Sequence, residues 1–324
     1  MQEMMLARAK ALLQSGDVQR VLGWQTGEFA YDVTPAAFET AEELDAKFVY
    51  NDFCGSNLSK YLVKESRKEG RVLVFLKPCD TYSFNQLIKE HRVVRENIYV
   101  IGVPCAGKTD GETLKGLGLK GILGVKDAGD SFTVETLYGE KTVSKQEALP
   151  ERCRSCKSHK HMVYDELLGE EGEVLDSHRF DMVEKIESMS ADERFAFWQG
   201  ELSRCIRCNA CRNVCPACTC EKCVFDNENS GIAQKAAADS FEESMFHIIR
   251  AFHVAGRCTD CGECSRVCPQ NIPLHLLNRK FIKDINTFYG AYQAGEDTES
   301  RAPLTNYTKG DAEPSIVYHK GGEK

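Results

Sequence analysis

The sequence has 324 residues, of which 28% are charged and 42% hydrophobic, and a formal net charge of −8. This length allows two domains with cores of their own, and the negative charge argues against general nucleic-acid binding, which needs a basic face. Sixteen cysteines are present, without a visible secretory leader or an apolar run of the roughly 18 residues that a membrane span needs. Because cytoplasmic thiols are kept reduced, we expect a cytoplasmic protein of anaerobic metabolism whose cysteines bind metal.

Residues 1–156 predict an α/β domain. The expected elements are helices over 4–14, 41–46, 57–69 and 81–90, strands over 18–24, 71–76 and 97–102, a loop over 111–124 and strand-like pieces over 132–143. The buried strands 71–76 and 97–102 enclose a helix, which makes a βαβ unit and therefore a partly parallel sheet. Cys79 and Cys105 follow these two strands, at the edge where such sheets place their sites.

Two copies of one cysteine pattern follow a charged, mostly helical linker over 157–200. Both read C-x2-C-x2-C-x3-C-P, the run that holds [4Fe–4S] clusters in bacterial ferredoxins. The copies consist of Cys205, Cys208, Cys211 and Cys215, and of Cys258, Cys261, Cys264 and Cys268. In such modules the fourth cysteine binds the other cluster, so the expected ligand sets are Cys205, Cys208, Cys211 with Cys268, and Cys258, Cys261, Cys264 with Cys215. Zinc sites and disulfides are the alternatives, although zinc ribbons need only pairs of CxxC.

The segment between the two copies favours an all-helical dicluster ferredoxin over residues 201–290. A helical stretch over 233–255 carries an apolar stripe made of Phe241, Met245, Ile248, Ile249 and Phe252. This pattern is typical of a helix rather than of the βαββαβ ferredoxins, and a further helix over 273–288 closes the module. The polar tail over 291–324 is expected to extend over a partner or to be loose.

Four other cysteines could form a third set, namely Cys79, Cys105, Cys153 and Cys156. The first two end adjacent strands and the last two form a CxxC. Basic residues that would offset the charge of a cluster stand beside them, at Lys77, Arg152, Arg154 and Lys157. The alternatives are two buried strand-end thiols and a surface redox pair.

Cys54, Cys218, Cys220 and Cys223 have no assigned partner. A fourth cluster from these four is arithmetically possible. They could also shield the ferredoxin clusters, or one of them could replace a predicted ligand. His159 and His161 follow the CxxC and could tune a cluster there, although exposed histidines at a helix start are the commoner case.

The order of the motifs resembles the iron–sulfur β subunit of methanogen-type formate dehydrogenases, and the amino half is similar to the β subunit of deazaflavin-reducing hydrogenases. The resemblance covers roughly residues 48–290 and is carried by Lys-Pro-Cys-Asp at 77–80, Ile-Gly-Val-Pro-Cys at 101–105, Cys-x2-Cys at 153–156, and the cysteine runs at 204–212, 215–223 and 258–269. In that family the strand-end cysteines and the following CxxC hold a proximal [4Fe–4S] cluster. The resemblance therefore implies a third cluster on Cys79, Cys105, Cys153 and Cys156.

Flavin-binding members of that family carry a Gly-Gly-x-x-Thr turn near the amino terminus and a Gly-rich segment after the CxxC. This chain has neither, so we expect no flavin. The sequence predicts a non-catalytic subunit of a hetero-oligomeric complex. Its [4Fe–4S] clusters would pass single electrons between a catalytic partner (formate dehydrogenase, hydrogenase or a heterodisulfide-reductase-type complex) and another carrier. The alternatives are a flavin-containing subunit that reduces a deazaflavin or nicotinamide coenzyme, and an electron subunit of a sulfite or sulfur reductase.

Overall fold

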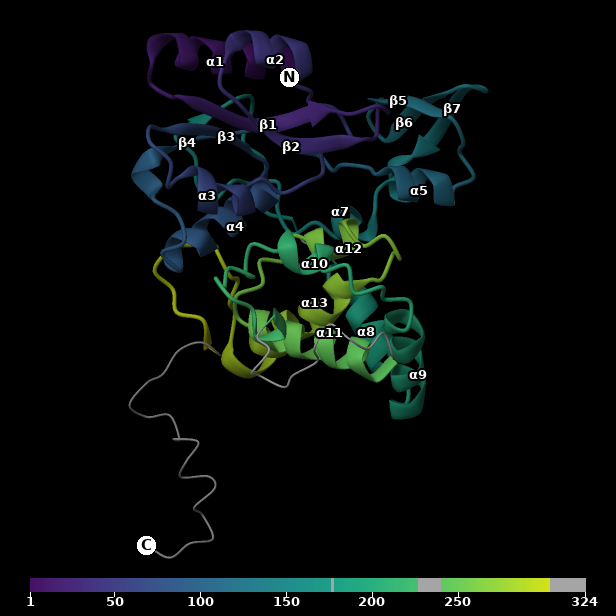
Figure 1. Ribbon diagram of the computed structural model, residues 1–324. Helices are drawn as coiled ribbons and strands as arrows, with labels where there is room; N and C mark the ends of the chain where they lie inside the picture. Colours follow the sequence, from purple (N-terminus) through teal and green to yellow (C-terminus); the bar gives the residue numbers. More distant parts are fainter. Residues whose placement is uncertain (176–177, 227–239, 304–324) are drawn as a thin grey trace, which may run out of the picture.

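The computed structural model of the chain describes residues 1–175, 178–226 and 240–303. A mixed α/β part lies at one end and a group of helices from the second half of the chain at the other (Figure 1). Between them lie the loops of the second half that carry cysteines, beside α10 (Ala210–Asn213) and α12 (Glu263–Arg266). No helix in the described ranges is long and apolar enough to cross a membrane.

The larger sheet has five strands in the order β2-β1-β3-β4-β8. Its strands are β1 (Arg20–Thr26), β2 (Val33–Phe38), β3 (Val72–Leu76), β4 (Ile98–Gly102) and β8 (Glu166–Leu167). The pairs β1–β3, β3–β4 and β4–β8 are parallel, whereas β2 runs antiparallel to β1. Every residue of β3 is buried, as expected for a parallel strand that is covered on both faces. The predicted mixed α/β fold with a partly parallel sheet is confirmed.

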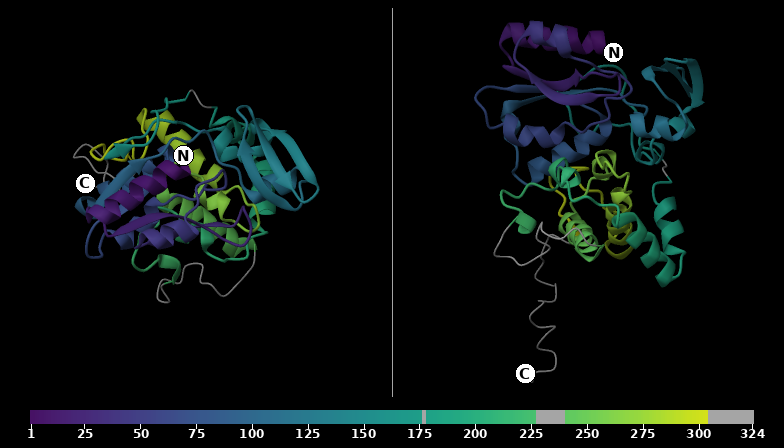
Figure 2. Two further views of the ribbon diagram at one scale, coloured as in Figure 1. Left: turned by 90° about the horizontal axis from the view of Figure 1, so that it is seen from above. Right: turned by 45° about the vertical axis from the view of Figure 1, so that its right-hand side comes forward.

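Helices cover both faces of this sheet (Figures 1 and 2). One face carries α1 (Gln2–Ser15) and α2 (Ala41–Lys47), and α1 buries Met5, Ala9 and Leu12 in the same core as the sheet residues. The other face, which points toward the cysteine loops, carries α3 (Leu62–Glu65) and α4 (Pro78–Lys89). The short 3-10 turns are η1 (Ser59–Tyr61) and η2 (Arg95–Asn97).

The segment over 111–124 is not the predicted loop. It contains α5 (Gly111–Gly116), which begins where the Asp110 side chain accepts a hydrogen bond from the Thr113 N–H at 2.8 Å. This N-cap outweighs the poor helix propensity of the glycines. A three-stranded antiparallel sheet follows beside the larger sheet (Figure 2), made of β5 (Ile122–Asp127), β6 (Ser131–Thr136) and β7 (Gly139–Ser144). The helices α6 (Lys145–Ala148) and α7 (Glu151–Arg154) come next.

The segment over 157–200 is less helical than predicted, because its first part supplies β8. The charged residues there pair with the edge of the sheet. Asp165 accepts a hydrogen bond from the Val100 N–H at 2.7 Å and lies 2.5 Å from Arg95, while Glu166 lies 2.8 Å from Arg8. Helical structure begins only with α8 (Asp181–Glu187) and α9 (Ala191–Leu202).

From residue 178 onward the described elements are helices. They are α8, α9, α10, α12, the 3-10 turn η3 (Val224–Asp226), α11 (Ser240–Val254) and α13 (Leu274–Tyr289). Residues 233–239 of the predicted helix over 233–255 lie outside the described residues.

The predicted apolar stripe of α11 does not form its buried face. Phe241 and Phe252 keep 68% and 62% of their surface exposed, whereas Phe246, His247 and Arg250 are buried. The reason is that α11 turns His247 and Arg250, together with Phe246, toward the cysteine loops, which leaves Phe241 and Phe252 on the surface.

The described part of the tail packs on its own chain. A Cβ on Gly295 would lie 1.8 Å from the Tyr82 carbonyl oxygen of α4, so the backbone can approach this closely only at a glycine. Lys89 donates to the Ser300 carbonyl oxygen at 2.6 Å, and Arg179 donates to Gln293 at 2.7 Å. Residues 291–303 therefore differ from the loose or partner-bound tail that was predicted, and residues 304–324 lie outside the described ranges.

Candidate metal centres

Two parallel strands bring Cys79 and Cys105 to one edge of the sheet. β3 and β4 pair from Val72↔Ile98 to Leu76↔Gly102, and each cysteine follows shortly after its strand. The loop around α7 adds Cys153 and Cys156. The Cys79 side chain lies close enough to those of Cys105 and Cys156 for electrostatic interaction. The Cys105 and Cys153 side chains are also close enough to interact. The structure thus brings these four residues together, and we call them the strand-end set.

A buried ion pair holds the turn that carries Cys79. The Lys77 ammonium donates to Asp80 at 2.7 Å and to the Ser56 carbonyl oxygen at 2.8 Å, and lies 4.7 Å from the centroid of the Trp24 ring. Pro78 starts α4, so Cys79 lies in the first helical turn, where the helix dipole favours negative charge. Burial and the Asp80 charge nevertheless raise the pKa of the Cys79 thiol, and the Lys77 charge offsets this only in part.

The two ferredoxin-type loops share an unusual backbone. Arg207 and Asp260, each two residues after the first cysteine of its loop, have φ of 54° and 58°. Asn209 and Gly262, four residues after it, have φ of 63° and 70°. Side chains other than glycine rarely adopt such angles, and they persist where the surrounding structure requires them. The repeated motif therefore produces one repeated backbone shape.

The cysteines of these loops group across the two copies. Cys205 and Cys211 interact electrostatically with Cys268, and Cys211 also interacts with Cys208. We call these four residues the outer ferredoxin set, because Cys208 is exposed.

The second copy likewise groups three of its own cysteines with the fourth cysteine of the other copy. Cys258, Cys261 and Cys264 all interact with Cys215, which belongs to the first copy in the sequence. We call these four residues the inner ferredoxin set. Both groupings are crossed as the pattern predicts, and their assignment as ligands stays a prediction.

Hydrogen-bond donors point at two of these sulfurs. The Arg207 N–H and His247 Nε2 lie 3.4 Å and 3.2 Å from the Cys205 sulfur, and the Asn278 amide lies 3.6 Å from that of Cys264. His247 Nδ1 is buried and has no partner among the described residues, so the ring proton belongs on Nε2, where it can be donated to sulfur. Donors of this kind stabilise thiolates and tune the potential of iron–sulfur centres.

Most of these thiols are too buried to ionise alone. Burial raises the pKa of Cys261 and of Cys264 to about 12, and that of Cys211 and of Cys156 to about 11. A thiolate there needs positive charge beside it, which bound iron supplies. Within the described ranges, no three Cys, His, Asp or Glu side chains converge closely enough to bind one bare metal ion. A cluster requires a wider arrangement, because each thiolate binds its own iron.

Arg152 lies between the strand-end set and the inner ferredoxin set. Its guanidinium interacts with Cys153 and Cys79, and it lies 3.8 Å from Glu263 of α12. Its Nε and Nη2 are buried without a hydrogen-bond partner in the described structure. A Cβ on Gly262 would lie 2.7 Å from the Arg152 Cβ, so the inner loop packs directly on this side chain. Unsatisfied buried donors beside four thiols fit an anionic group such as a cluster.

Lys157 and α4 join the same two sets by a second route. The Lys157 ammonium donates to the Thr259 carbonyl oxygen, lies 4.2 Å from the centroid of the Tyr82 ring, and interacts with Cys156 and Cys79. The Thr259 hydroxyl forms a hydrogen bond of 2.8 Å with that of Ser83. The inner loop is thereby fixed against the strand-end set.

A third junction is centred on Glu151 of α7. Its carboxylate accepts hydrogen bonds from His275 and from Arg279 (2.7 Å), both of α13, and Arg279 also donates to Asp260 of the inner loop at 2.9 Å. Burial by itself would raise the pKa of Glu151, but the His275 hydrogen bond and the Arg279 charge outweigh it and lower this pKa to about 2. The ionised carboxylate therefore stabilises the folded junction.

This network predicts a specific sensitivity to acid. Because the pKa is lower in the folded than in the unfolded chain, the stabilisation is complete above the ordinary value of 4.5 and is lost as the pH falls toward 2. We expect Glu151→Gln to lower the free energy of unfolding near neutral pH by about 1–3 kcal/mol. We also expect it to flatten the acid limb of a plot of anaerobic thermal midpoint against pH. Glu140→Gln on the exposed β7 is the control, and an equal acid limb in both variants would contradict the assignment.

The four cysteines without an assigned partner lie in two places. The Cys54 sulfur is buried in the core of the α/β part and accepts a hydrogen bond from the Asn51 N–H at 3.2 Å. Cys218, Cys220 and Cys223 instead line a cavity of about 380 Å³ next to α11. The structure therefore does not bring the four together. The Cys218 thiol donates to Cys215, which lowers the pKa of Cys215 to about 5.

The two histidines after the CxxC do not lie at the start of a helix. His161 is buried, its Nε2 lies 3.1 Å from the Val103 carbonyl oxygen and its Nδ1 lies 2.8 Å from Glu171. It therefore supports the chain that leads from β4 to Cys105. His159 is half-buried, and burial lowers its pKa.

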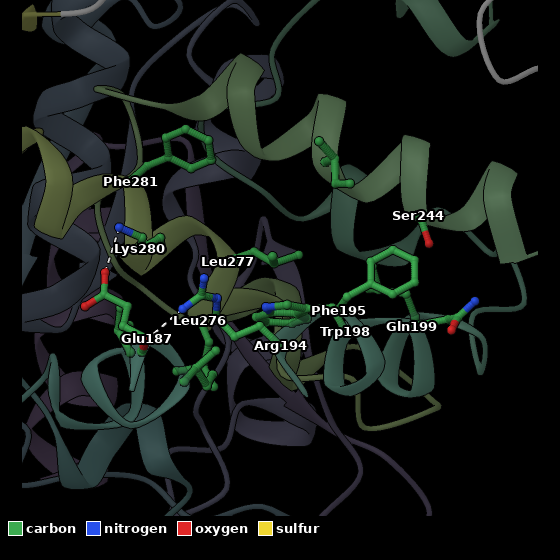
Figure 3. A pocket seen from close by; sticks show the side chains of 14 residues that line it. Glu187, Arg194, Phe195, Trp198, Gln199, Ser244, Leu276, Leu277, Lys280 and Phe281 are labelled. Atoms are coloured by element: carbon green, nitrogen blue, oxygen red, sulfur yellow. Dashed lines mark hydrogen bonds and ion pairs between the residues drawn. The ribbon is translucent and has the colours of Figure 1, made fainter. Parts of the chain in front are cut away.

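A cavity of about 670 Å³ lies between α8, α9, α11 and α13 (Figure 3). Phe195, Trp198, Leu276, Leu277 and Phe281 make its wall mostly apolar. At its rim, Lys280 lies 2.6 Å from Glu187, and Arg194 donates to the Glu187 carbonyl oxygen at 2.8 Å. Such a cavity suits apolar side chains rather than a polar substrate.

The chain is similar to several known proteins. A model of the 4Fe-4S dicluster domain matches residues 201–272. The chain is 25% identical to the F420-dependent formate dehydrogenase subunit beta of Methanocaldococcus jannaschii, with 92% of each chain covered. It is 23% identical to the F420-dependent formate dehydrogenase 1 subunit beta of Methanococcus maripaludis, with 91% of each covered. A chain of the F420-reducing [NiFe] hydrogenase complex from Methanosarcina barkeri is 11% identical, with a TM-score of 0.40, over 62% of this chain and 86% of that one.

Proposed function

Because the chain is homologous to β subunits of formate dehydrogenases over almost its whole length and contains a 4Fe-4S dicluster domain, we propose that it is the iron–sulfur electron-transfer subunit of an oxidoreductase complex. Its clusters, when bound, would take up and release one electron each. The observation that supports this proposal most is the close succession of three groups of four cysteines within one chain.

We assign one [4Fe–4S] cluster to each group. The strand-end set would hold the first, the inner ferredoxin set the second and the outer ferredoxin set the third. Two observations support the succession in this order. Arg152 and Lys157 contact both the strand-end set and the inner loop. Arg250 of α11 interacts with Cys215 and Cys264 on one side and with Cys211 on the other.

In this proposal the chain's own residues hold the clusters and set their potentials. Arg152, Lys157 and Arg250 place positive charge beside the thiolates, which favours the reduced, more negative state. His247 and Asn278 donate hydrogen bonds to sulfur with the same effect. The two ends of the series differ in exposure. Cys208 is exposed, whereas all four cysteines of the strand-end set are half-buried.

The remaining organisation belongs to the same proposal. We divide the chain into an α/β domain that includes β8 and so does not end at residue 156 as predicted, a linker that follows it up to residue 200, an all-helical dicluster ferredoxin over 201–290 and a tail over 291–324. Partner subunits would cover the exposed aromatic side chains of α11 and the apolar cavity beside it. A formate dehydrogenase, a hydrogenase or a heterodisulfide-reductase-type complex would supply the catalytic partner.

We further propose that this chain binds no flavin and has no substrate site of its own. The turns after β3 and β4 read Lys-Pro-Cys-Asp and Val-Pro-Cys-Ala, and their cysteines join the strand-end set. A flavin phosphate needs close backbone approach through glycines or a helix amino end.

The anaerobically purified chain tests this proposal. We expect iron–sulfur absorbance that a strong reductant bleaches, no oxidation of formate, hydrogen or NADH by the chain alone, and no flavin fluorescence in the supernatant after acid denaturation. Stoichiometric flavin would contradict the proposal and favour a subunit that reduces a deazaflavin or nicotinamide coenzyme. Absence of iron would contradict the electron-transfer role itself.

A further inference from the structure

Three thiols outside the proposed cluster sets meet in one basic cavity. Cys218, Cys220 and Cys223 form a C-x-C-x2-C run and all line the cavity of about 380 Å³. Cys218 and Cys220 also line an adjoining cavity of about 740 Å³ that extends to β2 and α3. None of the three forms a disulfide in the structure, and Cys220 is exposed. The site is therefore roomy, rich in sulfur and open to solvent.

Three cations at these cavities have carbonyl oxygens as their hydrogen-bond partners within the described ranges. Lys60 donates to the Cys218 carbonyl oxygen, Arg92 to that of Thr219, and Arg250 to that of Cys211 at 3.1 Å. The Nε atoms of Arg92 and Arg250 are buried and make no hydrogen bond there. By contrast, two other cations nearby have carboxylates, since Arg257 lies 2.5 Å from Glu90 and Arg212 lies 2.8 Å from Asp226.

This charge distribution distinguishes between two uses of the thiols. A neutral dithiol or disulfide would leave the half-buried Lys60 and Arg92 without a negatively charged side chain as hydrogen-bond partner at the cavity in the described structure, whereas Arg250 also faces the thiols of the two ferredoxin sets. An iron–sulfur cluster on three thiolates carries net negative charge and would offset these cations. The number of thiols points the same way, because a disulfide uses two of the three.

We propose that Cys218, Cys220 and Cys223 ligate a further [4Fe–4S] cluster next to the inner ferredoxin set. Cys54 takes no part, since it lies in the core of the α/β part. The fourth iron takes an oxygen or nitrogen ligand instead. The cavity wall offers the carboxylates of Glu221 and Asp226 and the imidazole of His253, a kind of ligand that replaces cysteine in some iron–sulfur centres.

This site extends the proposed function, because it adds a cluster beside the series rather than another member of it. The contact is direct. The side chains of Cys218 and of Cys215 of the inner set are adjacent, and Arg250 interacts with both residues. An iron with a ligand other than cysteine is also the one most easily removed by oxidation.

The test compares iron content in the full chain before and after removal of two thiols. We expect about sixteen iron atoms per wild-type chain and about twelve in the Cys220→Ser/Cys223→Ser variant, as for four and three [4Fe–4S] clusters. Cys54→Ser is the matched control and should keep the wild-type count. Mild oxidation should produce the EPR signal of a [3Fe–4S] cluster in the wild type and in Cys54→Ser, and not in the double variant.

The clusters of the proposed function contribute the same amount of iron to the double variant and to the wild type. The difference in iron content between the two proteins therefore tests this inference separately from the proposed function. Equal iron in the double variant and the wild type would overturn the inference, as would a Cys220–Cys223 disulfide in the purified protein. An iron loss in Cys54→Ser equal to that of the double variant would overturn the exclusion of Cys54. Circular dichroism of each variant shows whether a loss follows from misfolding.

Discussion

Replacing Cys153 and Cys156 together by serine is expected to remove about four iron atoms per chain, those of one [4Fe–4S] cluster. Both residues lie in the loop around α7, and their sulfurs meet those of Cys79 and Cys105 at the edge of the sheet. Without them two thiols remain, too few to hold a cluster. Rapid anaerobic alkylation followed by mass spectrometry should then find Cys79 and Cys105 modified, whereas they are protected in the wild type.

The same variant tests the role of this cluster within the fold. The strand-end set draws the loop after α7 onto the sheet, so its loss should lower the thermal midpoint as well. Cys54→Ser is the control, because it removes a thiol from the same part of the chain without touching the set. Full iron content in the Cys153→Ser/Cys156→Ser variant would show that these residues are a surface redox pair, the alternative that the sequence left open.

The local features of the sites could be predicted because short stretches of sequence determine them. The run Val72–Leu76 is apolar throughout and must be a buried strand, so Cys79 had to lie at its end. The cysteine spacing likewise predicted which sulfurs would meet across the two loops. The left-handed backbone at Arg207 and Asp260 was not predicted, since Arg does not signal a positive φ and Asp signals one only weakly.

The junctions between the sets depend on contacts that no local pattern reports. Arg152 meets Gly262, and Lys157 meets Thr259, across about a hundred residues of chain. The orientation of helix α11 also depends on such contacts. Its apolar spacing indicated a helix, but only the structure shows that Arg250 and His247 face the cysteine loops. β8 was not predicted, because a strand of two residues is too short to show a hydrophobic period.

Replacing Cys215 tests the crossed arrangement of the two ferredoxin sets. Cys215 stands in the first copy of the motif but lies beside Cys258, Cys261 and Cys264 of the second. Its loss should therefore expose those three thiols to alkylation, while Cys205 and Cys211 stay protected. Cys268→Ser is the mirror variant, and it should expose Cys205 and Cys211 and leave the second copy protected.

The nearness of Cys218 decides how this experiment must be designed. Its thiol is hydrogen-bonded to that of Cys215, so in Cys215→Ser it is the nearest sulfur that could take over as ligand. The decisive variant is thus Cys215→Ser/Cys218→Ser, with Cys218→Ser alone as its control. We expect Cys258, Cys261 and Cys264 to be alkylated in the double variant and protected in the control. Alkylation of Cys205, Cys208 and Cys211 in the double variant, with the second copy protected, would show that each motif binds its cluster with its own four cysteines.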